Sequence, residues 1–459
     1  MDKGSYNLGD ACHKSSPSII HVVKTKALVL LTALGLVAFY FAPFRLLNPH
    51  PPPSTQLDHL SSHCAHIPPI SPSEFVDRQT SLAQTLRSLN ASAYVAEPGA
   101  SAQFYGNISD SRWHLSERPL LLIITPNHDT STGHVQSKVT ILTPKFESTR
   151  AKLLNIPSAS GVDFVEWAEE ADPYTIAVSS VLDSLTEGGA IFVDGSVRNF
   201  IAEGLRTAAP HFSVKPAPVE VRRLRERKSP SELEILKCAN EVTLLAIRAT
   251  REQMYIGMRE SEGRTMIRGA LAKAGLEDLD SIVLFGENAA LPHGSGTDRV
   301  LGESDLILID CGGSLHGYHS DVTRTFALRS SFIPSAHLSL WKLVQDAQTS
   351  AHVTATSGTL TRTVDEVARE VILAQGYGQY FTHRLGHGIG LEGHESPYLR
   401  GGSDDIIQTG HTFSNEPGIY IEGKVGIRLE DCFYISEESG NAVYLTEGVG
   451  GPSRSPWFP

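Results

Sequence analysis

Two patterns of hydrophobic residues divide the chain beyond its first 70 residues. Before residue 220, stretches with apolar residues at helical spacing alternate with short apolar runs typical of buried strands: ASAYVAE, PLLLIITP, KVTILTP and AIFVDG. Beyond residue 229, strand pairs are interleaved with helices expected at about 231–258, 262–274, 338–356 and 362–376. The first pattern predicts an α/β domain over residues 71–220. The second predicts an α+β domain over residues 229–459.

The most apolar segment lies ahead of both domains. Ala27 to Phe44 reads ALVLLTALGLVAFYFAPF, an uncharged run that as a helix would be about 27 Å long, enough to cross a bilayer. We expect a signal anchor at 27–44, a cytosolic tail at 1–26 and a proline-rich linker at 45–70. A buried helix and a cleaved signal peptide are the alternatives.

The charges that flank this segment predict a topology. Four lysines precede it, whereas Arg45 is the only lysine or arginine between it and Arg78. The positive-inside rule then places the N-terminus in the cytosol and the catalytic domain in the lumen or outside the cell. In that location the sequons at Asn90 and Asn107 would accept glycans, so a glycoprotein is expected.

Overall composition excludes some classes of partner and site. Asp and Glu number 51 against 39 Lys and Arg, which gives a net charge of -12, and no dense basic block occurs. Nucleic acid is therefore not expected as a partner. The five cysteines are scattered without C-x-x-C spacing, so the sequence indicates neither a zinc ribbon nor a disulfide framework.

Carboxylates within apolar strands are the main chemical signal. Asp310 ends LILID, Asp321 follows eleven residues later, Glu416 lies in SNEPG and Glu430 lies in IRLED. A buried carboxylate needs a hydrogen-bonding partner, a cation or a metal. Four carboxylates carry about -4, which two divalent cations would balance. Oxygen ligands with one imidazole suit Mn²⁺, Co²⁺, Zn²⁺ or Fe²⁺.

The stretch HRLGHGIGLEGHESP, His383 to Pro397, is the richest nearby source of an imidazole. His383 and His387 have the four-residue spacing of a helical H-E-x-x-H zinc site. However, Arg384 stands where the general-base glutamate belongs, and the glycines disfavour a helix. An extended segment is expected, in which the histidines could be metal ligands, catalytic groups or ordinary loop residues.

Together with Asp310 and Asp321, the segments LGHGIGLEGHE, NEPGIY and GIRLEDC resemble, in order and spacing, the pita-bread metallopeptidases. The resemblance is to the branch of Xaa-Pro aminopeptidases and Xaa-Pro dipeptidases (prolidases), and it covers about Ser71 to Thr446. It implies an α/β N-terminal domain like that of creatinase and prolidase, followed by an α+β pita-bread (creatinase/aminopeptidase-like) catalytic domain. Such relatives are commonly dimers, so a homodimer is expected.

The resemblance also implies an activity. A hydroxide bridging two divalent ions, with Mn²⁺ as the first choice, would hydrolyse the Xaa-Pro bond at the N-terminus of peptides or in dipeptides, so the expected partner is a proline-containing peptide. The implied metal ligands are Asp310, Asp321, His387, Glu416 and Glu430, with Asp321 and Glu430 bridging. The implied catalytic residues are His293, His394, Glu416 and Arg428, and the implied substrate-binding residues are His293, His383 and His394.

Within this resemblance, Glu416 is expected to accept and relay a proton, and His394 to stabilise the oxyanion. His383 is expected to line a pocket for proline, and Arg428 to support the metal ligands or meet a substrate carboxylate. Two other functions remain open: a creatinase-like metal-free hydrolase and a catalytically silent binding protein. The five intact ligands argue against both. The sequence does not separate aminopeptidase from dipeptidase.

Overall fold

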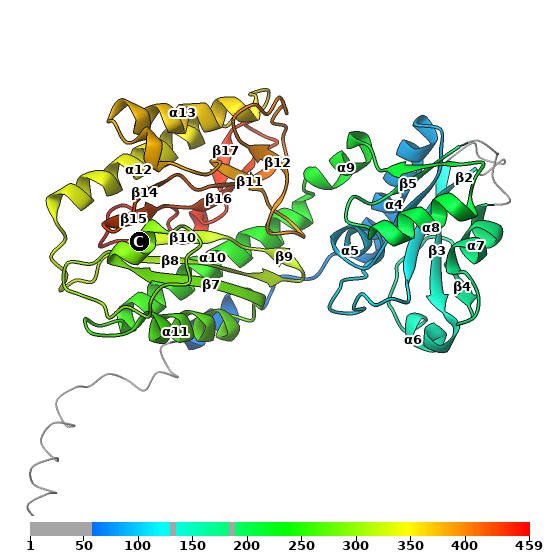
Figure 1. The fold of residues 1–459 in the computed structure, drawn as a ribbon, viewed down its shortest axis with the longest axis horizontal. Coiled ribbons are helices and arrows are strands. Elements are labelled where there is room, and N and C mark those ends of the chain that lie inside the picture. The colour runs from blue at the N-terminus through cyan, green and yellow to red at the C-terminus, as the bar shows by residue number, and fades with distance from the viewer. Residues whose placement is uncertain (1–56, 129–134, 183–188) are drawn as a thin grey trace, which may run out of the picture. The chain divides into compact units, whose positions relative to one another are not determined.

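The computed structural model describes residues 57–128, 135–182 and 189–459, and Figure 1 shows their path. Residues Leu57–Pro459 form one compact unit. Within it, the chain builds a first sheet with its helices, passes through α9 (Val219–Glu226), and then builds a second set of sheets and helices. The predicted order of an α/β domain before an α+β domain is confirmed.

The first domain is a six-stranded sheet with the strand order β4-β3-β2-β1-β5-β6. The β1–β2 and β2–β3 pairs are antiparallel, and the other three pairs are parallel. Its strands are β1 (Ala91–Ala96), β2 (Leu121–His128), β3 (Val135–Pro144), β4 (Val162–Trp167), β5 (Ala190–Val193) and β6 (Ser213–Pro216). Its helices are α4 (Pro72–Ser88), α5 (Ala100–Gly106), α6 (Ser148–Ala151), α7 (Pro173–Ala177) and α8 (Asn199–Ala208).

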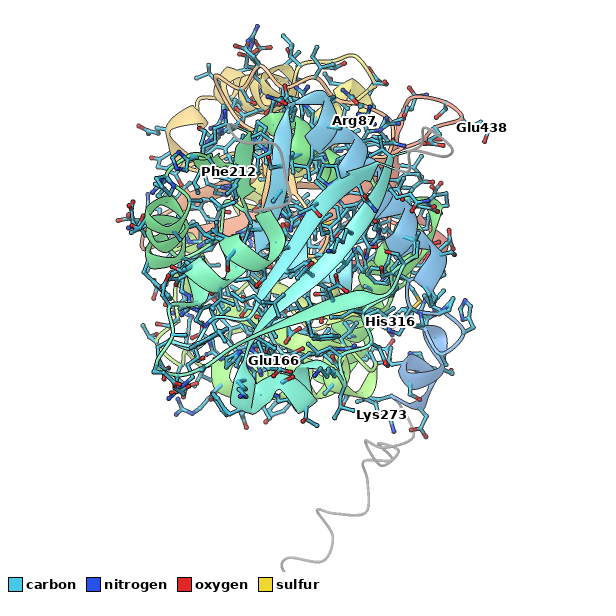
Figure 2. All side chains as sticks on the ribbon, turned by 90° about the vertical axis from the view of Figure 1, so that its right-hand side faces the viewer. Arg87, Glu166, Phe212, Lys273, His316 and Glu438 are labelled. Carbon is cyan, nitrogen blue, oxygen red and sulfur yellow. A yellow bond between two sulfur atoms is a disulfide. The ribbon has the colours of Figure 1, made fainter. Side chains whose placement is uncertain are left out.

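Alternation of buried side chains along β1 explains why helices cover both faces of this sheet. Tyr94 packs in a hydrophobic cluster with Leu86 of α4, whereas Val95 packs in a separate cluster with Leu205 of α8. Successive side chains of a strand point to opposite faces, so α4 and α8 lie on opposite sides of the sheet. Figure 2 shows the side chains of this region, with Glu166 of β4 labelled.

The second domain contains antiparallel sheets and paired helices. One sheet has the order β10-β8-β7, with β9 added to β8. A second has the order β12-β11-β13-β16-β17, and β14 pairs with β15. The strands are β7 (Glu277–Phe285), β8 (Ile307–Leu315), β9 (Tyr318–His319), β10 (Val322–Phe326), β11 (Gly386–Gly388), β12 (Glu395–Leu399), β13 (Thr412–Asn415), β14 (Gly418–Ile421), β15 (Val425–Arg428), β16 (Asp431–Ile435) and β17 (Ala442–Tyr444). The helices are α10 (Pro230–Gln253), α11 (Glu260–Lys273), α12 (Ser335–Thr354) and α13 (Thr361–Ala374).

The sequence at the start of α10 fixes where this domain begins. The Ser229 hydroxyl accepts a hydrogen bond from the backbone N–H of Glu232, whose carboxylate accepts one from the backbone N–H of Ser229. This capping box, with Pro230 in the first turn, satisfies backbone donors that a helix N-terminus otherwise leaves free.

Hydrogen bonds at one point join the two sheets of the second domain. The backbone N–H of Glu430 donates to the carbonyl of Thr323 in β10 at 3.0 Å. The fully buried Arg324 donates to the carbonyl of Glu430 at 2.6 Å and to the Asp431 carboxylate at 2.7 Å. The edge strand β10 of one sheet is therefore held against the start of β16 in the other sheet.

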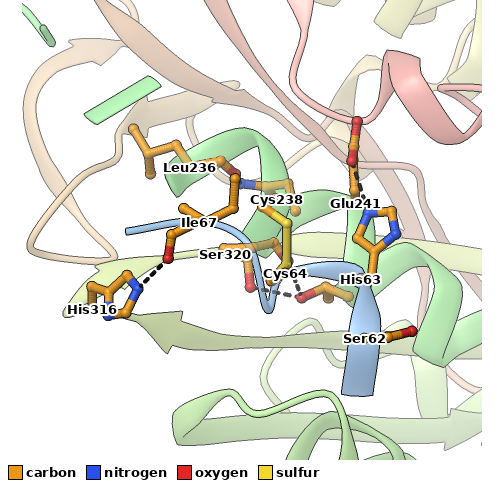
Figure 3. Close-up of a disulfide and its surroundings, with 12 residues drawn as sticks. Ser62, His63, Cys64, Ile67, Leu236, Cys238, Glu241, His316 and Ser320 are labelled. Carbon is orange, nitrogen blue, oxygen red and sulfur yellow. Dashed lines mark hydrogen bonds and ion pairs between the residues drawn. A yellow bond between two sulfur atoms is a disulfide. The ribbon is translucent and has the colours of Figure 1, made fainter. Parts of the chain in front are cut away.

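A disulfide between Cys64 and Cys238 ties the segment before α4 to α10, as Figure 3 shows. Next to it, His63 at the end of α3 (Asp58–His63) contacts Glu241 at 2.9 Å. The cysteine pattern had indicated no disulfide framework, and a helix and a disulfide lie in the segment expected to be linker. The two cysteines are 174 residues apart, and only the fold brings them together.

The prediction of a single-pass membrane protein with a lumenal or extracellular catalytic domain was wrong. Across residues 57–459, apart from the two internal gaps, no helix is long and apolar enough to span a membrane. Even α10, the longest of these helices, carries acidic and basic residues along its length. The predicted span at 27–44 lies outside the described residues. We withdraw the anchor and its topology, and with them the glycoprotein prediction at Asn90 and Asn107.

Replacing both bridged cysteines (Cys64→Ser with Cys238→Ser) should lower the free energy of unfolding by about 2–5 kcal/mol, because the cross-link restricts the unfolded chain over a long loop. Urea denaturation followed by circular dichroism measures this change. Dithiothreitol should lower the wild-type midpoint and leave that of the variant unchanged. Equal midpoints for the oxidised wild type and the variant would contradict a stabilising disulfide.

Candidate functional site

Both sheets of the second domain supply residues to one cluster. Asp310 lies in β8 opposite Thr323 of β10, and Asp321 immediately precedes β10. The other sheet supplies His387 from β11, while Glu416 follows β13 and Glu430 immediately precedes β16. The hydrogen bond from Glu430 to β10 brings these two groups of residues together.

The donor atoms of these residues lie close enough to share metal ions. Three groups have ligand atoms all within 4.8 Å of one another: Asp310, Asp321 and Glu430; His387, Glu416 and Glu430; and Asp321, His387 and His394. Asp321, His387 and Glu430 each belong to two groups, so the groups form one continuous cluster. His394 was expected to contact substrate, yet its imidazole also lies within ligand distance.

Burial and mutual repulsion both disfavour the ionised form of two carboxylates in this cluster. Burial, followed by the charges of Asp310 and Glu416, raises the pKa of Asp321 well above its usual value. Burial and the charges of Asp321, Glu416 and Asp310 do the same to the pKa of Glu430. Burial also acts to raise the pKa of Glu416, but its hydrogen bond to His387 and the nearby positive charges lower it to about 2.

Two atoms in the cluster are placed where they could bind a cation. Oε2 of Glu430 accepts a hydrogen bond from the Thr323 hydroxyl at 2.6 Å, but its buried Oε1 has no hydrogen-bond partner in the part of the chain that the structure describes. In His387, Nδ1 is 3.0 Å from the carbonyl of Gly388, to which it donates. Its Nε2 lies 3.3 Å from Glu416 and 3.7 Å from Asp321. Burial lowers the pKa of His387, but the hydrogen bond and charge of Glu416 and the charge of Asp321 outweigh it and raise that pKa. Loss of the Nε2 proton leaves this nitrogen able to bind a metal, so these residues fit divalent cations.

Arg428 stabilises the cluster through hydrogen bonds from its guanidinium. Its buried guanidinium donates to Asp310 at 2.6 Å, to the Thr323 hydroxyl at 3.1 Å and to the Tyr420 hydroxyl at 2.9 Å. Tyr420 in turn lies 2.8 Å from Nε2 of His383, whose Nδ1 is 2.7 Å from the carbonyl of Arg384. A chain of hydrogen bonds therefore runs from Asp310 to His383.

Sequence reasoning missed Thr323 and Tyr420, which complete this chain. Tyr420 ends the quoted NEPGIY segment, where its spacing from Glu416 was the available signal. Thr323 had no distinguishing signal, because threonine is common in strands.

The two expected substrate histidines lie at the edge of the cluster. The exposed His394 ring meets the ring of His387 edge to face, at an interplanar angle of 71° and with centroids 4.1 Å apart. Partial burial and the positive charges of His387 and Arg384 lower the pKa of His394, so its imidazole is neutral near pH 7. His293 is also exposed, and it follows Pro292, whose carbonyl lies 3.4 Å from both terminal nitrogens of Arg428.

Beside His394 lies a cavity of about 490 Å³. Its walls include Tyr94 and Asp194 from the first domain, Arg225 from α9, and Glu395 from β12. Residues from both domains and from the helix between them therefore surround the approach to His394.

Comparisons with known proteins agree with this geometry. Residues 234–437 match the profile of metallopeptidase family M24. An uncharacterised peptidase of Schizosaccharomyces pombe is 40% identical over 369 residues, covering 79% of this chain and 80% of the relative. An Xaa-Pro dipeptidase of Pyrococcus furiosus is 32% identical over 257 residues, or 56% of this chain and 73% of that enzyme.

Solved structures give the same result. The crystal structure of dipeptidase PepE from Mycobacterium ulcerans superimposes with a TM-score of 0.72 at 27% identity, over 82% of this chain and 97% of that chain. The expected pita-bread fold class is thereby confirmed.

Binding of Mn²⁺ to the metal-free protein should release protons, and the affinity should rise with pH. Because their pKa values are raised, Asp321 and Glu430 bind protons more tightly in the metal-free fold than free carboxyl groups do, and metal ligation must displace these protons. Calorimetric titrations in buffers of different ionisation enthalpy count these protons. Glu430→Gln should release fewer of them, and an enthalpy that does not depend on the buffer would contradict this electrostatic description.

Proposed function

The chain belongs to metallopeptidase family M24, and on that premise we propose that it hydrolyses the peptide bond between an N-terminal residue and a following proline. The substrate is a peptide or an Xaa-Pro dipeptide. The observation that carries the proposal is the sharing of Asp321 and Glu430 between metal-ligating groups. A relative that carries the name Xaa-Pro dipeptidase supports the choice of bond.

Two divalent ions fit the ligand charges. Asp310, Asp321 and Glu430 would hold one ion, and Asp321, His387, Glu416 and Glu430 the other. Four carboxylates then face two dications, which removes the repulsion that raises the pKa values of Asp321 and Glu430. Because oxygen ligands predominate, Mn²⁺ is our first choice, ahead of Co²⁺, Zn²⁺ and Fe²⁺. When bound, such ions supply Lewis acidity toward a water molecule and toward the carbonyl of the scissile bond.

Residues of the chain would move the proton and bind the developing charge. Glu416 is ionised near pH 7 in the metal-free fold, and it would accept the proton of the attacking water. A neutral His394 retains one ring N–H, which can donate to the carbonyl oxygen as that oxygen gains charge. The exposed His293 is proposed to contact the substrate from the neighbouring loop.

Arg428 and His383 would act through their neighbours. Every nitrogen of Arg428 is engaged within the cluster or with Pro292, so we propose that it holds Asp310 in place and does not bind a substrate carboxylate. Both ring nitrogens of His383 are also engaged. Only a face of its ring remains to line a pocket for proline.

Loss of a shared or imidazole ligand should abolish turnover. We expect Asp321→Asn and His387→Ala each to lower kcat/KM by more than about 100-fold, beyond the loss typical of residues that only support a ligand. Each should also lower the bound metal, measured by plasma mass spectrometry of dialysed protein. Exposed Glu438→Gln is the matched surface control. Full activity with full metal content in either variant would contradict the site.

Substrate length and the residue after the scissile bond test the specificity. With Mn²⁺ present, hydrolysis of Ala-Pro, Ala-Pro-Ala and Ala-Ala is compared by chromatography of the released amino acid. Cleavage of at least one proline substrate, well above that of Ala-Ala, is expected. The preferred length separates dipeptidase from aminopeptidase. Faster cleavage of Ala-Ala would overturn the assignment to Xaa-Pro bonds.

A further inference from the structure

Two basic residues at the junction between the domains contact acidic residues on either side of His394. Arg225 lies in α9, and Lys228 lies between α9 and α10. Lys228 pairs with Glu395, and Arg225 pairs with Glu392. We call these four residues the linker clamp.

Lys228 is the most tightly held member of the linker clamp. Its side chain is 1% exposed. The ammonium lies 2.6 Å from Oε1 of Glu395, 3.0 Å from the carbonyl of Arg225 and 3.1 Å from the carbonyl of Glu226. An ammonium has three donors, and all three are used. The end of α9 and the start of β12 are therefore joined through one buried nitrogen.

Arg225 adds a second connection two residues before His394. Its guanidinium donates to Glu392 and lies 3.6 Å from Oε2 of Glu395, a buried oxygen that accepts no hydrogen bond from the residues described. After His394, the hydroxyl of Ser396 donates to Glu226 at 2.7 Å. The linker thus contacts the active-site segment on both sides of His394.

Gly390 makes this packing possible. A Cβ added there would lie 2.6 Å from Oε1 of Glu395 and 2.7 Å from Cε of Lys228. The backbone N–H of Gly390 donates to the carbonyl of Glu392, which closes the turn. At least one glycine of the histidine-rich stretch is therefore required by the linker clamp.

By contrast, the imidazole of His394 has no hydrogen bond to any residue in the described ranges, although it must keep a defined position near His387. Its position therefore depends on its backbone, which Glu392 and Glu395 hold. We propose that Arg225 and Lys228 are positioning residues that fix His394 beside the metal ligands. This inference rests on the proposed role of His394 in Xaa-Pro hydrolysis.

The same contacts link the first domain to the site. Arg225 also approaches the hydroxyl of Ser101 in α5 at 3.5 Å, and it borders the cavity that His394 and Asp194 share. A change in the path of α9 would move Glu392, Glu395 and the histidine between them.

The test must separate positioning from stability, because removing one partner leaves a buried charge unpaired. Lys228→Met with Glu395→Gln removes both charges, keeps the length of the Glu395 side chain and shortens that of Lys228 by one atom. The matched control is Lys237→Met with Glu234→Gln, a pair on α10 in which Glu234 is 60% exposed. We expect the clamp double variant to keep its metal and lose about 10- to 100-fold in kcat, the range for groups that orient active-site residues, with a smaller change in KM.

A double-mutant cycle with His394→Ala identifies the residue through which the clamp acts. If the clamp acts by placing His394, the clamp double variant should cause no further loss of kcat in the His394→Ala background. The same fold loss in both backgrounds, or no loss in the wild-type background, would overturn the proposal.

Hydrogen exchange gives a readout that does not depend on activity. In the clamp double variant, protection should fall for the peptide covering residues 390–396 and stay unchanged in β8 and β10. Unchanged protection at 390–396 would overturn the proposal whatever the substrate is. A wild type that fails to cleave any Xaa-Pro peptide would instead refute the proposed function and leave the exchange experiment to decide on the clamp.

Discussion

Concentrated negative charge in a partly buried cluster is the constraint on which the rest of the site depends. Asp310, Asp321, Glu416 and Glu430 come from two sheets and have ligand atoms a few ångströms apart. Folding such a set without compensation is unfavourable, because burial and mutual repulsion both penalise ionised carboxylates. The positive charge of Arg428 balances part of this negative charge, and metal ions would balance the rest.

Glu430 and Asp431 show how carboxylates on two neighbouring residues acquire different roles. Asp431 is fully satisfied: Oδ1 accepts from Arg324 at 2.7 Å and from Thr446 at 2.8 Å, and Oδ2 from Gln348 at 3.2 Å. Among the described residues, by contrast, one buried oxygen of Glu430 has no hydrogen-bond partner. Asp431, whose two oxygens are hydrogen-bonded, helps to join the two sheets, whereas Glu430 is part of the cluster. The hydrogen bonds of Asp431 therefore help to hold Glu430 in position.

The pattern of hydrophobic residues predicted the order of the domains. Carboxylates inside apolar strands indicated four residues of the cluster, because such a carboxylate is costly unless a cation or a hydrogen bond stabilises it. The choice of His387 among the histidines came from the resemblance to the pita-bread metallopeptidases. The sequence did not identify residues whose side chains are common at their kind of position. Thr323, Tyr420 and Lys228 matter through what they contact, and Cys64 finds Cys238 only in the folded chain. Hydropathy at 27–44 suggested an anchor for a segment that lies outside the described residues.

Anomalous diffraction at the manganese edge, from crystals grown with Mn²⁺, tests the central claim most directly. The account predicts two peaks, one among Asp310, Asp321 and Glu430 and the other among Asp321, His387, Glu416 and Glu430. A single peak would contradict the shared two-metal arrangement. No peak at this cluster, with the carboxylates in the same positions, would contradict the claim that metal ions balance its charge.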